Sequence, residues 1–355
     1  MRLCSNLSFA ILVAGAAFSL SGQLNYAQPS PATQQTPSQT VDRDPVRSPD
    51  AETPQAQQPL RKQGGGYILH TDVEEVLLNV TVLDGNRLVP DLKKENFQVY
   101  EDGVPQTLIS FQHTDVPVSM ALVVDNSGSM MRKRPSVNKS ALDLIQASNP
   151  QDEAFVVNFS DEAFLDQEFT SDVNKLRDGL AHIESRGGTA LYDAVVASAD
   201  KLAADAKRGK QVIILITDGE DNASTLNLEQ TIRRVQALSG PVIYSIGLLF
   251  GEEMTHAEVR HARRALEMLS TETGGMAFFP KSIEQVDQIA AEVARDIRNQ
   301  YTLGYHSTKP TTEPGFRRVQ VNAAGKSGGK LTARTRTGYF PVAKVAKQTA
   351  SASKD

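Results

Sequence analysis

The chain has 355 residues, of which 40% are hydrophobic, so it is long enough to bury a sizeable core in one large domain or two smaller ones. Its formal net charge is −5 and it has no long basic block, which argues against a nucleic-acid partner because phosphate binding requires clustered Lys and Arg. The only cysteine is Cys4. A lipid-attachment cysteine is expected at the end of a signal sequence, whereas Cys4 precedes the first apolar run. With a single cysteine the chain cannot form an internal disulfide.

The first residues have the pattern of an export signal. Arg2 supplies a short positive region, and residues 7–20 form an apolar run that is too short to span a bilayer comfortably. Cleavage is expected after Gly22 or Ala27, and Ala27 is preferred because the Pro/Gln-rich composition begins just beyond it. Residues 1–27 are therefore predicted to be a signal peptide, with an uncleaved N-terminal anchor as the alternative. The mature protein is expected to be periplasmic or extracellular, without stable membrane insertion.

Two segments lack any apolar periodicity. Residues 28–65 contain seven of the 17 prolines and are rich in Gln, Thr and Ser, which predicts a disordered, extended linker. Residues 343–355 are predicted to be a disordered tail. The intervening chain divides into an N-terminal β segment (66–116), a central domain (117–299) and a C-terminal β segment (300–342).

The two outer segments have strand patterns. In the N-terminal segment, apolar residues alternate over 76–83 before a turn at 84–86, and strands are also expected at 97–100 and 107–111. The C-terminal segment has similar runs at 301–305, 317–322 and 331–336. One economical arrangement pairs the two segments into a single β-sandwich that holds the central domain as one insertion. Two unrelated β appendages are the alternative.

The central domain alternates between strand and helix patterns. Apolar runs of strand length are found at 120–124, 154–159, 212–216, 242–249 and 276–279. Helical spacing is found at 136–147, 171–184, 190–206, 227–238, 256–272 and 283–299. This alternation predicts the α/β class, with a doubly wound, mostly parallel sheet covered by helices on both faces.

A polar motif directly follows the first of these central strands. Asp125, Ser127 and Ser129 are spaced so that one turn can direct a carboxylate and two hydroxyls to one point, and ligands of doubly wound sheets gather at the carboxyl ends of strands. Such oxygen donors suit Mg²⁺, Mn²⁺ or Ca²⁺. The six histidines show no zinc-site spacing. Taken singly, each of the three residues could be a helix cap or a turn residue.

This D-x-S-x-S sequence resembles the metal-ion-dependent adhesion site of von Willebrand factor type A domains. The resemblance continues at Gly187-Gly188-Thr189-Ala190-Leu191, which is similar to the family's threonine loop, and at Ile213–Glu220, which is similar to the strand that carries its last aspartate. It implies a Rossmann-like fold and a metal site formed by Asp125, Ser127, Ser129, Thr189 and Asp218.

The implied site has two carboxylates and three hydroxyls. Two carboxylates neutralise a divalent ion, and Mg²⁺ takes about six ligands at roughly 2.0–2.1 Å, so five protein groups leave a position open. The resemblance implies that a Glu or Asp of a protein partner fills this position. Mg²⁺ is the expected ion, with Mn²⁺ or Ca²⁺ as alternatives.

Other charged residues near the motif are not expected to be metal ligands. Asp193 is interpreted as a second-sphere or helix-stabilising group, and Asp221 as a solvent-facing turn residue. The Arg132-Lys133-Arg134 cluster is interpreted as a solvated charge run, although it would also suit the steering of an acidic partner.

The flanking motifs extend the resemblance. Residues 89–97 with Glu101-Asp102-Gly103, and residues 301–305 with Gly338-Tyr339, look like the exported VWFA-related proteins abundant in acidobacteria. The expected function is a non-enzymatic, adhesion-type module that binds protein through its metal. One alternative is a structural part of a cell-envelope assembly with a stabilising metal. A hydrolase is the other, but G-x-S-x-G is absent and no His lies near either serine in the sequence.

Overall fold

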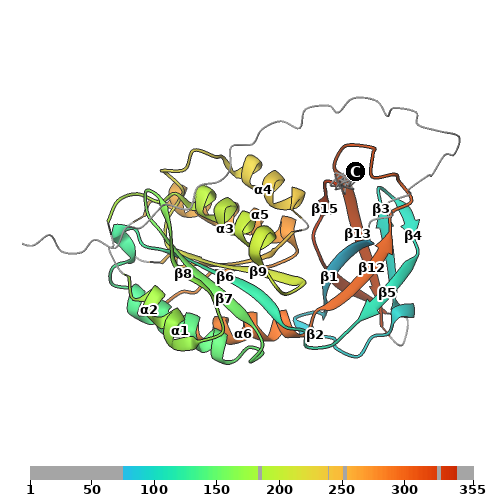
Figure 1. The fold of residues 1–355 in the computed structure, drawn as a ribbon, viewed down its shortest axis with the longest axis horizontal. Coiled ribbons are helices and arrows are strands. Elements are labelled where there is room, and N and C mark those ends of the chain that lie inside the picture. Colours follow the sequence, from blue (N-terminus) through green and yellow to red (C-terminus); the bar gives the residue numbers. More distant parts are fainter. Residues whose placement is uncertain (1–74, 183–185, 239, 251–253, 326–328, 342–355) are drawn as a thin grey trace, which may run out of the picture. The chain divides into compact units, whose positions relative to one another are not determined.

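The computed structural model describes residues 75–182, 186–238, 240–250, 254–325 and 329–341. The predicted signal peptide, linker and C-terminal tail lie outside these described residues. Within them the chain forms an α/β domain that is flanked in sequence by two groups of β-strands (Figure 1).

The α/β domain contains six α-helices among the described residues. Its strands are β6 (Val118–Asp125), β7 (Glu153–Phe159), β8 (Ala163–Thr170), β9 (Lys210–Thr217), β10 (Val242–Gly247) and β11 (Ala277–Phe278). Its helices are α1 (Arg134–Gln146), α2 (Val173–Leu180), α3 (Leu191–Asp205), α4 (Leu228–Ala237), α5 (His256–Thr273) and α6 (Val286–Arg298), with short 3₁₀ turns η2 (Gly128–Met130) and η3 (Ile283–Gln285).

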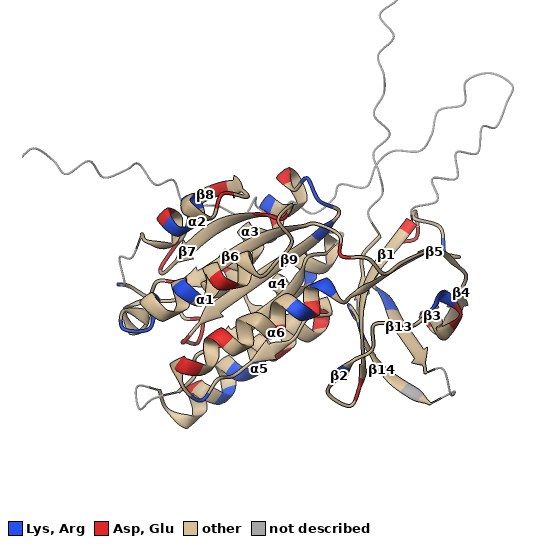
Figure 2. Ribbon diagram, turned by 90° about the horizontal axis from the view of Figure 1, so that it is seen from below, with Lys and Arg blue, Asp and Glu red and all other residues tan. Residues whose placement is uncertain are grey.

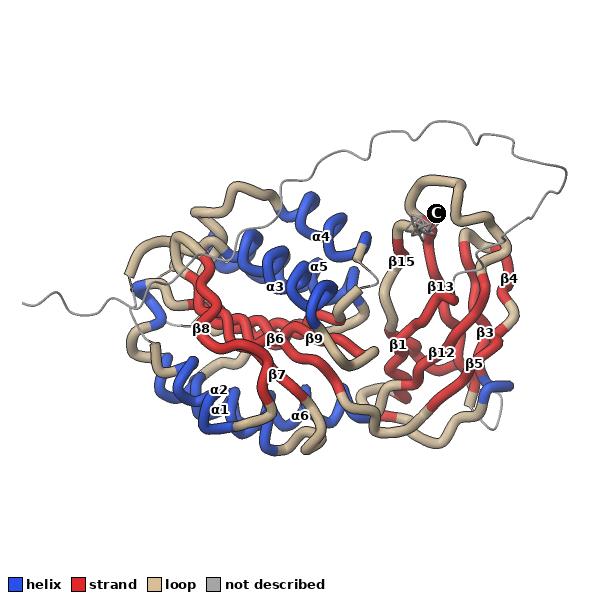
Figure 3. The backbone as a smooth tube through the Cα atoms, viewed as in Figure 1, coloured by secondary structure: helices blue, strands red, loops and turns tan. Residues whose placement is uncertain are grey.

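The strand order of this sheet is β11-β10-β9-β6-β7-β8, and every pair is parallel except β7 with β8. All eight residues of β6 are buried, as expected for a central strand that is covered on both faces. Helices α3, α4 and α5 cover one face of the sheet, and α1, α2 and α6 cover the other (Figures 1 and 3). The predicted doubly wound α/β class is therefore confirmed.

Alternate residues of β6 supply two separate cores. Met120, Leu122 and Val124 pack with α1, α2 and α6, whereas Ala121 and Val123 pack with α3, α4 and α5. The side-chain period of two along a strand divides an unbroken apolar run between the two faces in this way. The central strands are thereby fixed in position, and with them the loops at their carboxyl ends.

The flanking strands combine N-terminal and C-terminal segments in one sheet. The N-terminal strands are β1 (Glu75–Asp84), β2 (Arg87–Leu88), β3 (Phe97–Glu101), β4 (Val104–Gln106) and β5 (Leu108–Gln112), with the 3₁₀ turn η1 (Lys94–Asn96). The C-terminal strands are β12 (Tyr301–His306), β13 (Arg317–Ala324), β14 (Lys330–Arg334) and β15 (Gly338–Tyr339). The order is β4-β3-β13-β14-β1-β12-β5, with β2 on β1 and β15 on β13. The two segments therefore pair, and the α/β domain is an insertion between β5 and β12.

The expected sandwich of two sheets is not what forms, because hydrogen bonds connect all nine strands into one sheet. This sheet curls on itself. Phe97 of β3 and Phe111 of β5 lie near opposite ends of the strand order, yet their ring centroids are 5.8 Å apart, and each ring also contacts Tyr301 of β12. A single curled sheet can enclose one apolar core, which removes the need for a second sheet.

Charges of both signs are distributed over the described surface. Figure 2 shows basic and acidic positions interspersed along α5 and α6. None of the described helices is long and apolar enough to cross a bilayer.

Candidate metal centre

The predicted motif lies at the carboxyl end of the central strand. Asp125 is the last residue of β6 and is fully buried. Its Oδ1 accepts a hydrogen bond from the backbone N–H of Ser127 at 2.7 Å, and its Oδ2 accepts one from the Thr217 hydroxyl at 2.6 Å. Because β6 and β9 are neighbours in the sheet, Thr217 fixes this carboxylate from the adjacent strand.

Three of the predicted ligands meet in this loop. The hydroxyls of Ser127 and Ser129 are 3.2 Å apart, and the Ser129 hydroxyl donates to Oδ1 of Asp218 at 2.8 Å. Asp218 directly follows β9, so its carboxylate reaches the motif across neighbouring strand ends. Two hydroxyl oxygens and a carboxylate thus lie close together, although Ser129 and Asp218 are 89 positions apart in the chain.

Thr189 enters from the loop before α3. Its backbone N–H donates to the Asn222 side-chain oxygen at 2.8 Å, and its carbonyl accepts from the Asn222 N–H at 3.0 Å. A Cβ built on Gly219 would lie 3.4 Å from the Thr189 hydroxyl oxygen. The Thr189 hydroxyl therefore lies beside the residue that follows Asp218.

Two glycines precede Thr189 and lie close to the Asp161 side chain. Gly187 has φ +80°, and a Cβ there would lie 2.1 Å from an Asp161 carboxylate oxygen. The Gly188 N–H donates to the same carboxylate at 2.6 Å. A side chain at Gly187 would be strained and would also displace Asp161, so this pair of glycines sets the path of the Thr189 loop.

The electrostatics of the site are those of two neighbouring carboxylates. Burial raises the pKa of Asp125 to about 6, hydrogen bonds from Ser127 and Thr217 oppose this, and the charge of Asp218 adds to it. Lys133 Nζ donates to Asp218 Oδ2 at 2.5 Å. A buried, partly self-repelling pair of carboxylates is an environment in which a cation is favoured.

The interpretation of the Arg132–Arg134 cluster as a solvated charge run is wrong for two of its three residues. Arg132 is exposed, but the Lys133 side chain is only 16% exposed and is paired with Asp218. Arg134 is completely buried and donates to Asn158 Oδ1 at 2.7 Å and to the Leu180 carbonyl at 3.0 Å. The helix that follows the motif turns these basic side chains inward.

The two predictions for nearby acidic residues, Asp193 and Asp221, fare differently. Asp193 accepts hydrogen bonds from the backbone N–H groups of Thr225 and Leu226 at 2.8 and 3.1 Å, which matches a stabilising role outside the site. The expectation that Asp221 faces solvent is wrong. Asp221 is half-buried and accepts from the Ser224 hydroxyl at 2.5 Å, and burial raises its pKa.

A pocket of about 350 Å³ opens over the motif. Ser127, Ser129, Thr189 and Asp218 all line it, and Asp125 lies beneath them. Among the described residues no three Asp, Glu, His or Cys side chains cluster as ligands of one metal. Two carboxylates with three hydroxyls remain a donor set that fits Mg²⁺, Mn²⁺ or Ca²⁺, and their charges would neutralise a divalent ion.

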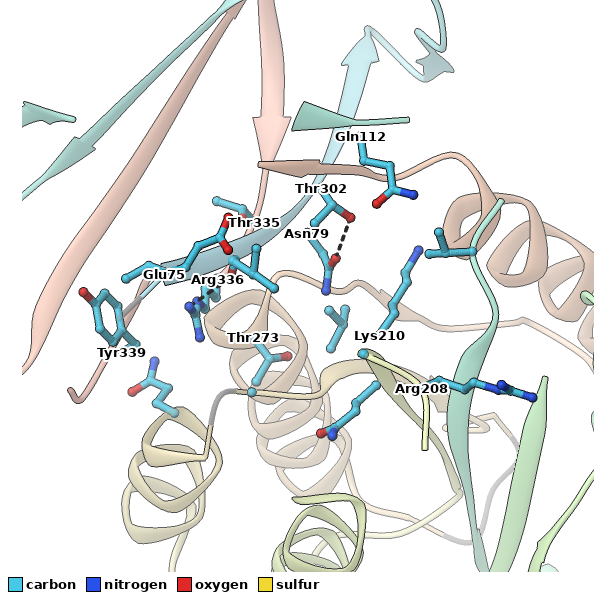
Figure 4. Close-up of a pocket in the computed structure, with 18 of the residues that line it drawn as sticks. Glu75, Asn79, Gln112, Arg208, Lys210, Thr273, Thr302, Thr335, Arg336 and Tyr339 are labelled. Carbon is cyan, nitrogen blue, oxygen red and sulfur yellow. Dashed lines mark hydrogen bonds between the residues drawn. The ribbon is translucent and has the colours of Figure 1, made fainter. Parts of the chain in front are cut away.

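A larger pocket, of about 520 Å³, lies elsewhere and contains none of the five predicted ligands. The hydroxyl of Thr302 on β12 donates to Asn79 Oδ1 on β1 at 3.4 Å. Figure 4 shows this pair in the pocket, with Lys210 of β9 across the opening. We place the candidate site at the smaller pocket because, of these two pockets, it is the one that combines Asp218 with the hydroxyls of Ser127, Ser129 and Thr189.

Sequence reasoning missed the residues that hold the ligands in place. Thr217, Asp161 and Asn222 each bond to the motif or the Thr189 loop, and Lys133 pairs with Asp218. Their partners are 27 to 92 residues away in the chain. Of these four, Thr217 lies within the segment 213–220 and Asn222 and Lys133 lie next to the motifs, whereas Asp161 lies in none of them.

Comparison with known proteins gives one family match. Residues 120–220 match the family model of the von Willebrand factor type A domain. The chain is 27% identical over 310 residues to human inter-alpha-trypsin inhibitor heavy chain H4, a match that covers 76% of this chain and 32% of that protein. The bovine protein of the same name is 26% identical over 241 residues, covering 59% of this chain and 25% of that protein. The chain thus spans about a third or less of these relatives.

Two solved structures are also similar. One is a von Willebrand factor type A protein from Catenulispora acidiphila, with a TM-score of 0.45 and 13% identity, covering 73% of this chain and 75% of that one. The other is the PilB minor pilin from Streptococcus sanguinis, with a TM-score of 0.42 and 15% identity, covering 52% and 62%. The family match, taken with the doubly wound sheet, shows that the chain contains a von Willebrand factor type A domain, matched over residues 120–220.

Proposed function

We propose that the protein is a non-enzymatic, metal-dependent protein-binding module of the adhesion type. Mg²⁺, or Mn²⁺ or Ca²⁺ in its place, would be held by Asp125, Ser127, Ser129, Thr189 and Asp218. The observation that carries the proposal is a chain of contacts in which the Ser127 hydroxyl lies 3.2 Å from that of Ser129 and the Ser129 hydroxyl donates to Asp218, beside the buried Asp125 carboxylate. The larger pocket does not offer this donor set.

The pocket also limits the chemistry of the partner. A bound divalent cation would supply a positively charged position that accepts a Glu or Asp carboxylate. The rim beside it includes Leu249, Phe250, Met254 and Val259, so a complementary surface would place apolar side chains around its acidic residue. The partner is proposed to be a protein outside the cytoplasm, in keeping with the predicted signal peptide and the likeness to exported VWFA-related proteins.

A hydrolase is less well supported. The hydrogen-bond partners of the Ser129 hydroxyl are Ser127 and Asp218, and none of the described residues that line the pocket is a histidine. A nucleophilic serine requires a neighbouring base that is oriented by a third group. Here the Ser129 hydroxyl donates to the Asp218 carboxylate, which also pairs with Lys133, an arrangement suited to cation binding.

Calorimetric titration of Mg²⁺ into the purified chain tests the metal site. Wild-type protein should bind one Mg²⁺ ion, and Asp125→Asn should abolish binding because it removes one of the two charges that neutralise the ion. Glu229→Gln is the matched control, since Glu229 is an exposed acid on α4 away from the pocket. Equal absence of binding heat in the wild type and Asp125→Asn would refute the site.

Partner capture with and without EDTA distinguishes a metal that takes part in partner binding from a metal that only stabilises the fold. Immobilised protein should retain an envelope protein in Mg²⁺ and release it in EDTA, and Asp218→Ala should not retain it. If EDTA lowers the melting temperature but leaves retention unchanged, the metal is structural and the alternative of an envelope component is favoured.

A further inference from the structure

Lys133 occupies a specific position in the proposed metal site. It lies between the 3₁₀ turn of the motif and α1, and its Nζ donates to Asp218 Oδ2 at 2.5 Å. The Lys133 side chain is 16% exposed and that of Asp218 is fully buried. The same Nζ is 5.6 Å from the centre of the Phe250 ring. The ammonium group therefore lies inside the pocket, held on one side by a carboxylate and on the other by an aromatic ring.

With the Lys133–Asp218 ion pair, every oxygen of the two carboxylates Asp125 and Asp218 accepts a hydrogen bond. Asp218 accepts from Ser129 at Oδ1 and from Lys133 at Oδ2. Asp125 accepts from Ser127 at Oδ1 and from Thr217 at Oδ2. All four carboxylate oxygens thus have donors supplied by the chain itself, and one of these donors carries a full positive charge.

We propose that Lys133 is a tethered competitor of the divalent ion, an inference that rests on the metal site of the proposed function. Its ammonium neutralises Asp218 when no ion is bound and must leave that carboxylate for an ion to bind. An ammonium and a divalent cation on one carboxylate would repel each other strongly beside a side chain as buried as that of Asp218. Lys133 therefore lowers the affinity of the site, and metal binding releases its side chain.

This arrangement sets the ion concentration at which the module becomes competent to bind a partner. With Lys133 in place, the metal-free pocket has no net negative charge from Asp218 and is not left with a bare buried carboxylate. A metal ion must then displace the Lys133 ammonium from Asp218. Because this ammonium is part of the same chain, it is always present beside the site. The affinity for metal is therefore a property of Lys133 as well as of the ligands.

Calorimetry on the full chain tests the competition. Lys133→Met keeps the length of the side chain and removes its charge, and should bind Mg²⁺ about 10- to 100-fold more tightly than the wild type, the range expected for loss of one charge-assisted hydrogen bond. Lys139→Met is the matched control. It removes the same charge from a lysine in α1, the helix that begins directly after Lys133, but Lys139 is 62% exposed and pairs with Asp143 and Asp287. Its affinity should stay within about twofold of the wild type.

The outcomes separate this inference from the proposed function. If neither the wild type nor Lys133→Met binds Mg²⁺, the metal site itself is refuted. If both bind with equal affinity, or Lys133→Met binds more weakly, the metal site stands and the competitor role is overturned.

Acylation of lysine by an N-hydroxysuccinimide ester, mapped by mass spectrometry, gives a second measurement. Lys133 should react slowly in metal-free protein and several-fold faster in saturating Mg²⁺, whereas Lys139 should be unchanged. Asp218→Asn should make Lys133 reactive without metal. A Lys133 rate that is independent of Mg²⁺, in protein that calorimetry shows to bind it, would overturn the inference.

Discussion

At the scale of single residues, Lys210 is a buried charge outside the metal site. It begins β9, is 8% exposed, and its Nζ donates to the carbonyl of Ile297 at the end of α6. Burial lowers its pKa to about 8, although the charges of Asp296, Asp115 and Asp152 act in the opposite direction. The folded protein therefore holds this proton less firmly than the unfolded chain does.

This difference predicts a pH dependence of stability. Between about pH 8 and the ordinary lysine value of 10.5, the unfolded chain binds more protons at Lys210, so the contribution of this residue to stability rises with pH. From pH 7 to 9.5 the wild type should gain about 2 kcal/mol relative to Lys210→Met, at about 1.4 kcal/mol per pH unit. Urea unfolding of both proteins across this range measures the gain.

The exposed Lys139 provides the control for that experiment. Lys139→Met should follow the wild-type pH profile from pH 7 to 9.5, because the pKa of Lys139 is raised by its pairing with Asp143 and Asp287 and it stays charged throughout. A constant difference between the wild type and Lys210→Met over the same range would show that Lys210 is not buried as a charge.

At this scale the sequence predicted the ligand types better than their environment. Local spacing after a strand singled out Asp125, Ser127 and Ser129, whereas Thr189 and Asp218 were implied by the family resemblance, and four of these five predicted ligands line one pocket. The residues that orient them act over long sequence separations: Thr217 lies within the segment 213–220 but bonds to Asp125, 92 residues away, and Asp161 carries no motif. The interpretation of Lys133 fails because a run of basic residues is normally solvated, and only the helix direction turns it inward.

At the scale of elements, all six central helices were predicted from apolar periodicity, whereas β8 was missed. Its sequence, Ala163–Thr170, contains Asp166 and Glu168 and lacks the unbroken apolar run of the other strands. β8 is the edge strand of the sheet and pairs antiparallel with β7. Edge strands are partly solvated and tolerate charge, so hydrophobic pattern alone does not reveal them.

A buried carboxylate links helix α6 to three strands. Asp296 is 4% exposed and accepts hydrogen bonds from Thr81 of β1 at 2.9 Å, Tyr244 of β10 at 2.8 Å and Arg334 of β14. Elements of the curled sheet and of the α/β domain therefore meet at one side chain.

Asp296→Ala is expected to lower the free energy of unfolding by about 3 to 5 kcal/mol, because it leaves the charge of Arg334 buried without its carboxylate. Chemical denaturation measures the loss. Asp287→Ala on the same helix is the comparison, since its side chain is 54% exposed, and a much smaller loss is expected. Similar losses for the two variants would mean that the buried network contributes little.

At the scale of the whole molecule, the sequence suggests that one domain is inserted within another but does not establish it. The strand rhythm at both ends is local, whereas the pairing of β1 with β12 joins residues more than 200 positions apart, as in Val76 opposite Tyr305. A local pattern also cannot distinguish two sheets from one curled sheet. Contacts between rings from strands near opposite ends of the sheet, such as Phe97 with Phe111, indicate one curled sheet.

Truncation after residue 299 tests the pairing. It removes β12 and β14, two of the three strands that pair with β1, and β13, a partner of β3, so residues 75–112 should become sensitive to trypsin while the α/β domain stays resistant. Mass spectrometry of the digestion products, with the intact chain as control, measures this. Continued protection of residues 75–112 would indicate two independent β units.

The connections of the inserted domain have a mechanical consequence. Asp125 ends β6 at the pocket, while the chain from β5 enters β6 at its opposite end, at Val118. The other connection, from α6 to β12, lies near that end too, where Lys210 at the start of β9 bonds to Ile297. A partner pulling at the pocket would therefore load β6 along its length, and the parallel ladders with β7 and β9 would resist in shear, with many hydrogen bonds sharing the force.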